Sequence, residues 1–571
     1  MTKCFDATFR VKAPSGPTLL KYLRTVRHLK YSQAAYLFSR RLLPVRSGKA
    51  MSDTPDLRNS VEWLPFVRPD AVDVDSSEIE FLNRRRKIDT RDMDWCCSEE
   101  TKLWRYNLHY FDYLQWDTYS NEVKSRLIDS WIGSNPVSTV DAWEPYTVSL
   151  RAVNWIKYFL LTDQNGKVSK VWLRSLAKQL LWLEVNLEYH LLANHLLKNA
   201  KALIFSGVYF SGDMARRHLD KGMQLMLEEV NEQILPDGGH FERSPMYHCI
   251  VLEDVLDVVN ILNANASLVR SEDLSVLKQA ATRGRQFLED VLGADGTIPL
   301  FNDAAVGISA APADLLAYAQ RVLNRRAEEK SDEPLRVNLS DTGYYGYRFN
   351  GDSLLIDCGM IGPDYQPGHA HCDTLSYELC INGRRVIVDS GVYDYEISEL
   401  RHYVRSTAAH NTVRIDGLEQ SEIWGAFRVA RRAKPIFAEL GEWHDDCLEF
   451  RGAHDGYCRL PGKPVHKRRV RMESAGRWAF TDVVTGSGIH LIESFIHIHP
   501  DFGVTPESDR SFLITDGEFP MARLHVESKC EIRVVVGNYC LEFGKQLDNP
   551  VVSLTLHGQL PLTLSYSIEK I

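Results

Sequence analysis

The stretch LRSLAKQLLWLEVNLEYHLL, residues 173–192, repeats leucine every three or four positions, at Leu176, Leu180, Leu183, Leu187 and Leu191. This spacing matches the turn of an α-helix, so it predicts an amphipathic helix with one apolar face. Similar patterns recur from about residue 100 to 330, with short breaks at Asn165-Gly166, Pro236-Asp237-Gly238-Gly239 and Gly293. Short breaks favour antiparallel helix pairs, so we expect an all-helical bundle or toroid.

Beyond about residue 340 the pattern changes to short runs rich in Val, Ile, Tyr and Thr. Examples are SLLIDCG (353–359), RRVIVDSG (384–391), EIRVVVGNY (531–539) and VVSLTLHG (551–558). Such runs predict β-strands. The charged segment AEEKSDEPLRVNLSD lies between the two patterns and places a domain boundary near 325–342. The predicted organisation is an N-terminal extension (1–90), a helical domain (91–335) and a strand domain (336–571).

Composition narrows the function classes. The chain has 571 residues, 44% of them hydrophobic and 25% charged, which is typical of folded proteins with more than one core. A net charge of −9 argues against nucleic acid or an anionic membrane as partner, so a polyanion would have to be met by clustered arginines. The eleven scattered cysteines form no disulfide framework.

Targeting signals are absent from the sequence as it stands. No apolar run reaches the length of a membrane span, and the opening residues lack the order of a signal peptide. We therefore expect a cytoplasmic protein, or a periplasmic or secreted one if a leader has been removed. The basic segment LLKYLRTVRHLKYSQAAYLFSRRL (19–42) is interpreted as a solvated or docking helix rather than a membrane anchor, because it lacks a clean apolar face.

The densest polar cluster is PGHAHCDTLSYEL, residues 367–379. His369 and His371 are two positions apart and would point the same way on a strand. Asp389 and His410 could add a carboxylate and a third imidazole, giving ligands that zinc or manganese accepts. The other interpretation is that these histidines are structural. Asn382-Gly383 predicts a two-residue hairpin that pairs Asp389 with Ser376, short of His371, so regular pairing alone does not assemble the site.

Two segments of the helical half carry further polar residues. Asn194 and His195 interrupt the apolar segment LLANHLLKNAKAL (191–203), which indicates either a structural polar bridge or a site at a helix end. Tyr247 follows Pro245 at a predicted helix start in LPDGGHFERSPMYHCIVLEDVL (235–256). Its alternative role is packing at the rim of the bundle.

These motifs, with VDSGVYDY (388–395) and RSTAAHNTV (405–413), resemble in order and separation the heparinase II/III-like polysaccharide lyases and related alginate and broad-specificity glycosaminoglycan lyases. WRYNLHYFDYL (104–114) and WEPYTVSLRAVNW (143–155) resemble family segments that line the sugar cleft. The resemblance implies a multidomain α+β fold, in which an incomplete α/α toroid of helical hairpins precedes an antiparallel β-sandwich. It also implies β-elimination on a uronic-acid-containing polysaccharide.

The resemblance implies roles for individual residues. Tyr247 corresponds to the acid that protonates the leaving oxygen, and it could also serve as the base. Asn194 and His369 would neutralise the uronate carboxylate, and His195 would take a supporting or proton-transfer position. A divalent ion, zinc or manganese in preference to calcium, would be structural, with ligands matched at His371, Asp389 and His410.

Candidate substrate contacts are less specific. Arg105, Trp143 and Arg151 lie in the cleft-like segments, and each could equally be packing. Arg243 is the nearest cation in sequence that could lower the pKa of Tyr247, and Tyr403 is a candidate for the second tyrosine that some relatives use. The expected partner is an acidic polysaccharide or oligosaccharide such as heparan sulfate, hyaluronan or chondroitin, with alginate as the alternative. A glycoside hydrolase and a non-catalytic polysaccharide-binding protein are the rival functions.

Overall fold

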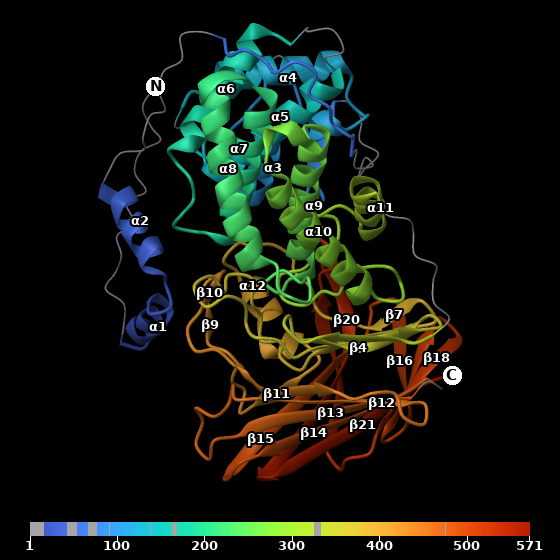
Figure 1. Cartoon of the computed structure of the whole chain (residues 1–571). Helices are drawn as coiled ribbons and strands as arrows, with labels where there is room; N and C mark the ends of the chain where they lie inside the picture. The colour runs from blue at the N-terminus through green and yellow to red at the C-terminus, as the bar shows by residue number, and fades with distance from the viewer. Residues whose placement is uncertain are drawn as a thin grey trace.

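The computed structural model describes residues 16–42, 54–66, 77–90, 92–137, 139–162, 168–324, 333–473 and 476–571. A helical half precedes a strand half in the chain, and Figure 1 shows one stacked on the other. The predicted break at Asn165-Gly166 lies outside the described residues, as does part of the predicted boundary segment. The predicted fold class, a helical toroid followed by an antiparallel β-sandwich, is confirmed.

The helical half is built from hairpins of consecutive helices. After a small hairpin of β1 (Glu78–Phe81) and β2 (Arg84–Lys87), its helices are α3 (Lys102–Tyr110), η1 (Asp112–Gln115), α4 (Asn121–Ser134), α5 (Pro145–Thr162), α6 (Lys170–Glu184), α7 (Ala193–Tyr209), α8 (Gly212–Gln233), α9 (Pro245–Ala264), η2 (Ala266–Leu268), α10 (Ser271–Val291) and α11 (Pro312–Leu323). Helix α7 packs along α8, and α9 along α10. Their apolar faces share one core, which explains the repeat of three or four residues in the sequence.

The leucine repeat does not form a single helix. Helix α6 ends at Glu184 and α7 begins at Ala193, so Leu187 and Leu191 lie in the connection. The chain turns there because Leu192 and Ala193 adopt positive φ angles of 62° and 53°. The break places Asn194 and His195 in the first turn of a helix rather than in its middle.

The strand half is antiparallel throughout its named sheets. A five-stranded sheet contains β3 (Leu335–Leu339), β4 (Tyr344–Phe349), β5 (Asp352–Asp357), β6 (Tyr377–Ile381) and β7 (Arg384–Ile387). A four-stranded sheet, in the order β19-β20-β15-β8, contains β8 (Val413–Ile415), β15 (Ile489–His497), β19 (Glu531–Tyr539) and β20 (Leu547–Gln559).

An eight-stranded sheet completes this half. In spatial order it contains β11 (Pro435–Leu440), β12 (Cys447–His454), β13 (Val465–Glu473), β14 (Arg477–Thr485), β21 (Leu562–Lys570), β18 (Phe519–Val526), β17 (Ser511–Asp516) and β16 (Phe502–Ser508). Strands β13 and β14 alternate buried and exposed residues, as expected for a sheet with one face on the core. Apolar residues from all three large sheets form that core.

Short elements between β7 and β11 carry much of the polar site. They are α12 (Glu399–Val404), η3 (Thr407–Ala409) and the small hairpin of β9 (Ile423–Trp424) and β10 (Arg428–Val429). The loop 367–376 before β6 is not a strand, so the expected extended conformation of the His369 and His371 segment is wrong. Within the described part of the chain, no helix has the length and apolarity that crossing a membrane requires.

Helices α1 (Gly16–Val26) and α2 (Tyr31–Leu42), here called the N-terminal arm, run along one side of both halves (Figure 1). On α1, Tyr22 packs edge-on against Trp424 of β9, with ring centroids 4.5 Å apart. Just before α2, Lys30 forms an ion pair with Glu232 of α8. The arm therefore contacts the strand half through α1 and the helical half at the start of α2, as expected for a docking helix.

Candidate active site

Tyr247 lies in the first turn of α9. Ser244 caps this helix by accepting a hydrogen bond from the Tyr247 backbone N–H at 3.3 Å. The Tyr247 hydroxyl shares a hydrogen bond with the hydroxyl of Tyr395 at 3.2 Å, and its ring stacks on the imidazole of His369 with centroids 3.8 Å apart. Burial raises the pKa of Tyr247 well above its usual value, so the resting side chain is a neutral phenol that carries a proton.

Asn194 and His369 meet at one carboxylate. The Asn194 amide donates to Glu242 Oε1 at 2.9 Å, and the Nε2 nitrogen of His369 lies 3.3 Å from Glu242 Oε2. Glu242 and Asn194 are buried. The two groups predicted to bind a uronate carboxylate are thus brought together across the helical and strand halves, and Glu242 orients both.

His195 is held beside this group by Glu188. Its Nδ1 nitrogen is 3.2 Å from Glu188 Oε1, and its ring lies 4.5 Å from that of Tyr146. Burial alone would lower the pKa of His195, but the adjacent Glu188 carboxylate outweighs it and the pKa is raised. The Glu188 carboxylate therefore favours the protonated imidazole more than solvent would.

Asp303 links the two histidines of the 369–371 segment. Its oxygens accept hydrogen bonds from His369 Nδ1 at 2.9 Å and from His371 Nε2 at 2.8 Å. Arg401 of α12 binds the same carboxylate through both terminal nitrogens. Burial alone would raise the pKa of Asp303, but Arg401 and the two imidazoles hold it well below its usual value. Asp303 is therefore an ionised anchor and not a proton donor.

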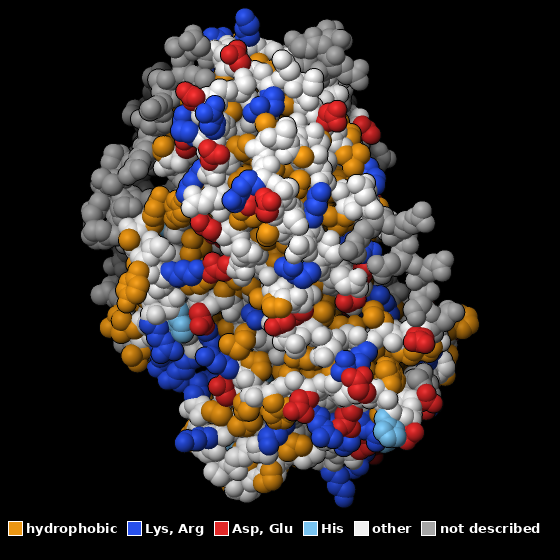
Figure 2. Space-filling model, in the orientation of Figure 1, with side chains coloured by type: hydrophobic (Ala, Val, Ile, Leu, Met, Phe, Trp, Pro, Cys, Tyr) orange, Lys and Arg blue, Asp and Glu red, His pale blue; other side chains and the backbone are white. Residues whose placement is uncertain are grey.

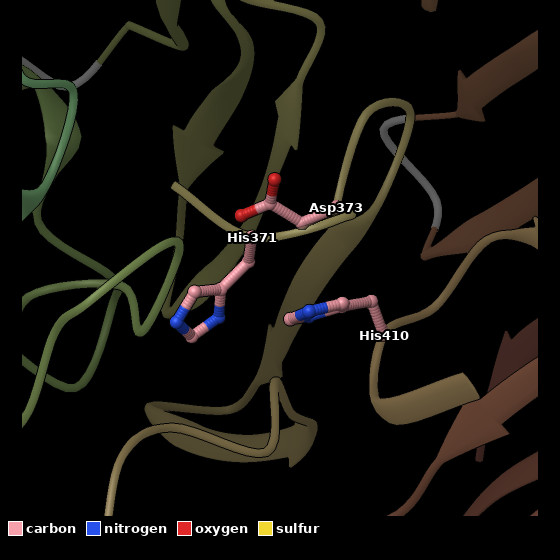
Figure 3. A group of neighbouring side chains, drawn as sticks. All are labelled: His371, Asp373 and His410. Carbon is pink, nitrogen blue, oxygen red and sulfur yellow. The ribbon is translucent and has the colours of Figure 1, made fainter. Parts of the chain in front are cut away.

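Three buried side chains form a group with metal-ligand geometry. His371, Asp373 and His410 each offer an atom within 4.8 Å of the others, and Figure 3 shows the two imidazoles side by side beneath the loop that carries Asp373. The Nδ1 nitrogen of His371 and the Nε2 nitrogen of His410 are buried without a hydrogen-bond partner among the described residues. Buried nitrogens of this kind are normally paired, so the two residues fit a divalent ion.

The predicted ligand set and this group differ in one residue. Asp389 accepts a hydrogen bond from His410 Nδ1 at 2.7 Å. It therefore contacts the nitrogen of that ring that is already paired, and not the unpaired Nε2. The Asn382-Gly383 hairpin exists, and Ile381 pairs with Arg384 as predicted. A register shift lies between Leu379 and Cys380, and the segment before Tyr377 is outside the sheet, so Asp389 and His371 both approach His410.

Several predicted substrate contacts belong to the core instead. Trp143 is buried and donates a hydrogen bond to the Asn135 carbonyl. Arg151 is fully buried, and its guanidinium donates to the Gln179 side chain and the His109 carbonyl. Neither side chain can reach a sugar, so both assignments are corrected. The spacing of large residues could not separate a cleft wall from a packed helix face.

The remaining predicted arginines are already engaged. Arg105 forms an ion pair with Asp141 at 2.7 Å and is partly exposed. Arg243 donates to the backbone carbonyls of Phe241, Asp341 and Thr342, and these contacts direct its guanidinium to the chain around residue 342. Arg401, whose guanidinium carbon lies 5.0 Å from the Tyr395 ring centroid, is the cation beside the tyrosine pair.

Tyr395, and not Tyr403, is the second tyrosine at this site. Tyr403 lies near Ser390 and Gly537 rather than beside Tyr247. Tyr395 is the last residue of the VDSGVYDY motif, so this motif could have identified it in the sequence. Asp373 could have been found because it continues the two-residue spacing of His369 and His371. Asp303 and Arg401 gave no local signal.

Comparison with known proteins identifies the family that this chain resembles in both halves. The family models described as heparinase II/III N-terminus and heparinase II/III-like, C-terminal match residues 77–324 and 332–567. Heparin-sulfate lyases of Bacteroides stercoris and Bacteroides thetaiotaomicron are 24% and 26% identical over 356 and 328 residues, covering 54% and 50% of this chain and 52% and 46% of theirs. The chain thus spans about half the length of these curated relatives.

Solved structures share the fold. A heparinase III structure covers 84% of this chain and 79% of its own, with a TM-score of 0.63 at 18% identity. The heparan sulfate lyase from Pedobacter heparinus covers 85% of this chain and 79% of its own, with a TM-score of 0.59 at 18% identity. At this identity the likeness concerns the fold.

Proposed function

Because the chain belongs to the heparinase II/III family, we propose that it is a polysaccharide lyase that cleaves an acidic, uronate-containing polysaccharide by β-elimination. The observation that carries this proposal is the contact of Tyr247 with both Tyr395 and His369, where His369 and Asn194 both contact Glu242. Glycosaminoglycans of the heparan sulfate class are the proposed substrates, since the curated relatives are heparin-sulfate lyases.

The reaction requires these groups. A base removes the C5 proton, the electron pair forms the C4=C5 double bond, and the C4–O4 bond breaks as O4 receives a proton. The carboxylate on C5 gains negative charge as the proton leaves, so hydrogen-bond donors there stabilise the transition state. We assign this role to Asn194 and His369; the contacts of both with Glu242, which bring them to one point, support the assignment. No water is consumed.

The tyrosine pair supplies the proton transfers in this proposal. Tyr247 is neutral at rest, which suits it to protonate O4. Tyr395 lies within hydrogen-bond distance of it and beneath the Arg401 guanidinium, so either phenol can stabilise the other while one is deprotonated. Tyr247 and Tyr395 are therefore assigned the acid and base work together.

A divalent ion, zinc or manganese, is proposed at His371 and His410 with Asp373 or Asp389. Two open imidazole nitrogens and buried carboxylates are ligands that these ions accept. The His371 ring also donates to Asp303, the anchor of His369, so an ion here would stabilise the loop 367–376. Its proposed role is structural.

Two acids that a hydrolase could use are already engaged by other groups. Asp303 is ionised and fully bonded, while Asp237 binds the backbone and hydroxyl of Thr342. Digestion of heparan sulfate, hyaluronan, chondroitin and alginate, followed by mass spectrometry, tests the proposal. Unsaturated uronate ends with ultraviolet absorbance are expected; saturated products heavier by one water would mean hydrolysis and refute it.

A further inference from the structure

A pocket lined with arginines lies outside the candidate active site. It encloses about 400 Å³ and is lined by five arginines and one acidic residue, Arg24, Arg27, Arg431, Arg432, Arg459 and Asp455. Figure 2 shows Lys and Arg side chains gathered where α1 meets β9 and β10. A pocket of this volume accommodates part of an oligosaccharide rather than a single ion.

The charge of this pocket is only partly neutralised by the protein. Arg24 pairs with Glu422 at 3.0 Å, and Arg431 lies 3.6 Å from the same carboxylate. Arg459 donates to backbone carbonyls, including that of Gln420 at 3.0 Å. Because carbonyls carry no net charge, the arginines of the lining outnumber the carboxylates that pair with them.

Arg432 gives the clearest sign of a missing partner. Its side chain is 3% exposed, and one terminal nitrogen donates to Asp364 at 2.7 Å. Its Nε and Nη2 atoms are buried with no partner among the described residues. These two atoms form one edge of the guanidinium fork, which normally donates in parallel to two oxygens of one anion. An oxyanion would satisfy both.

The pocket and the candidate active site share one hairpin. Phe427, between β9 and β10, lies 6.2 Å from the His369 ring and 5.1 Å from the Tyr395 ring, whereas Arg431 and Arg432 follow β10 and line the pocket. Arg432 is five positions after Phe427, so their Cα atoms are at most about 18 Å apart. One oligosaccharide can bridge such a distance.

We propose that the arginine pocket is a second subsite, which binds a sulfate group on the acidic saccharide whose uronate occupies the active site. This inference rests on the proposed function for the identity of its ligand. Sulfate is favoured over a uronate carboxylate because the arginines come from α1, from residues 431–432 and from residue 459, and a tetrahedral group with three free oxygens can accept from several directions.

Binding to a catalytically impaired protein tests the subsite without turnover. In the Tyr247→Phe background, Arg27→Ala with Arg431→Ala should weaken the Kd for a heparan sulfate octasaccharide about tenfold or more at constant ionic strength. The matched control is Arg174→Ala with Arg216→Ala, which removes the same charge from exposed positions on α6 and α8 and should leave the Kd unchanged. The Kd for the desulfated octasaccharide should be unchanged by either pair of substitutions.

A second variant addresses the buried arginine. Arg432→Met removes the unpaired donors, and its melting temperature reports whether it folds; a folded variant should lose the same binding. An unchanged Kd in Arg27→Ala with Arg431→Ala, or equal losses with the desulfated ligand, overturns the subsite. If the unsubstituted protein cleaves no polymer but the sulfate-dependent difference persists, the proposed function fails while the subsite stands.

Discussion

The hydroxyl oxygens of Tyr247 and Tyr395 lie 3.2 Å apart, although the two residues belong to different halves of the chain. Tyr247 comes from the first turn of a toroid helix and Tyr395 from the loop after β7. The pair therefore exists only when the halves are docked, and it ties proton transfer to the relative position of the two domains.

Tyr247→Phe removes one oxygen and keeps the ring that packs on His369. We expect a folded protein whose kcat falls about 10²- to 10⁴-fold, the range of a general acid or base. Unsaturated-product formation measures kcat, and the melting temperature checks the fold. Retention of more than about a tenth of the activity would mean that this phenol is neither the general acid nor the general base.

Tyr395→Phe should also reduce kcat strongly while leaving the melting temperature close to that of the parent. Combined with Tyr247→Phe, the losses should be far from additive, because both residues serve one elimination event. Tyr393→Phe is the matched control, two positions away and outside the tyrosine pair. Equal effects of Tyr393→Phe and Tyr395→Phe would contradict the assignment of Tyr395.

Asn194→Ala removes a donor from the carboxylate site. A donor of this type stabilises a transition state by on the order of 3 kcal/mol, so kcat should fall about 10²-fold. Glu242→Gln should reduce activity through misplacement of Asn194 and His369, whose contacts it holds. Its effect should shrink when Asn194 is already alanine; full additivity in this double-mutant cycle would argue against a shared site.

Metal content can be measured by elemental analysis of the purified protein. One zinc or manganese per chain is expected, and chelation should lower both melting temperature and activity. Asp373→Asn and Asp389→Asn separate the two carboxylate candidates. The substitution that removes the ligand should abolish metal binding, whereas the other substitution should only weaken it. A chelated protein with unchanged melting temperature and activity would mean that the ion is dispensable.

Glu229 offers a test of stability against pH. Burial raises the pKa of this α8 carboxyl to about 7, above the unfolded value of 4.5, so the folded state holds the proton more tightly. Its contribution to stability is therefore present at low pH and is lost as pH rises through 7. Glu229→Gln should therefore stabilise the protein more at pH 8 than at pH 5. The difference between its effects on the free energy of unfolding at the two pH values should be about 1–3 kcal/mol. The exposed Glu228→Gln should show no such difference in urea titrations.

The sequence predicted the parts of the fold that follow from repeated patterns. Helical periodicity and strand-like runs located both halves, and the Asn382-Gly383 turn was correct because its chemistry is local. The helix break at residue 184 was missed, since leucine spacing continues through it. Trp143 and Arg151 were misassigned because burial depends on which face of a helix meets the core.

Site residues divide in the same way. Tyr247, Asn194 and His369 carry motif signals, and the structure brings them together through contacts to one another or to Glu242. Asp303 and Arg401 lie far apart in sequence and meet only through tertiary packing. No spacing rule reaches across 98 residues to identify such a pair.

The N-terminal arm changes how the two halves can move. Besides the contacts across the interface of the halves, such as that of Asp303 with Arg401, the arm connects them at a separate place through Tyr22 and Lys30. A body held at two separated points cannot pivot freely about one of them, so opening of the domains must first release one attachment. The exposed ion pair between Lys30 and Glu232 is the weaker of the two contacts of the arm, and rising salt concentration should break it first.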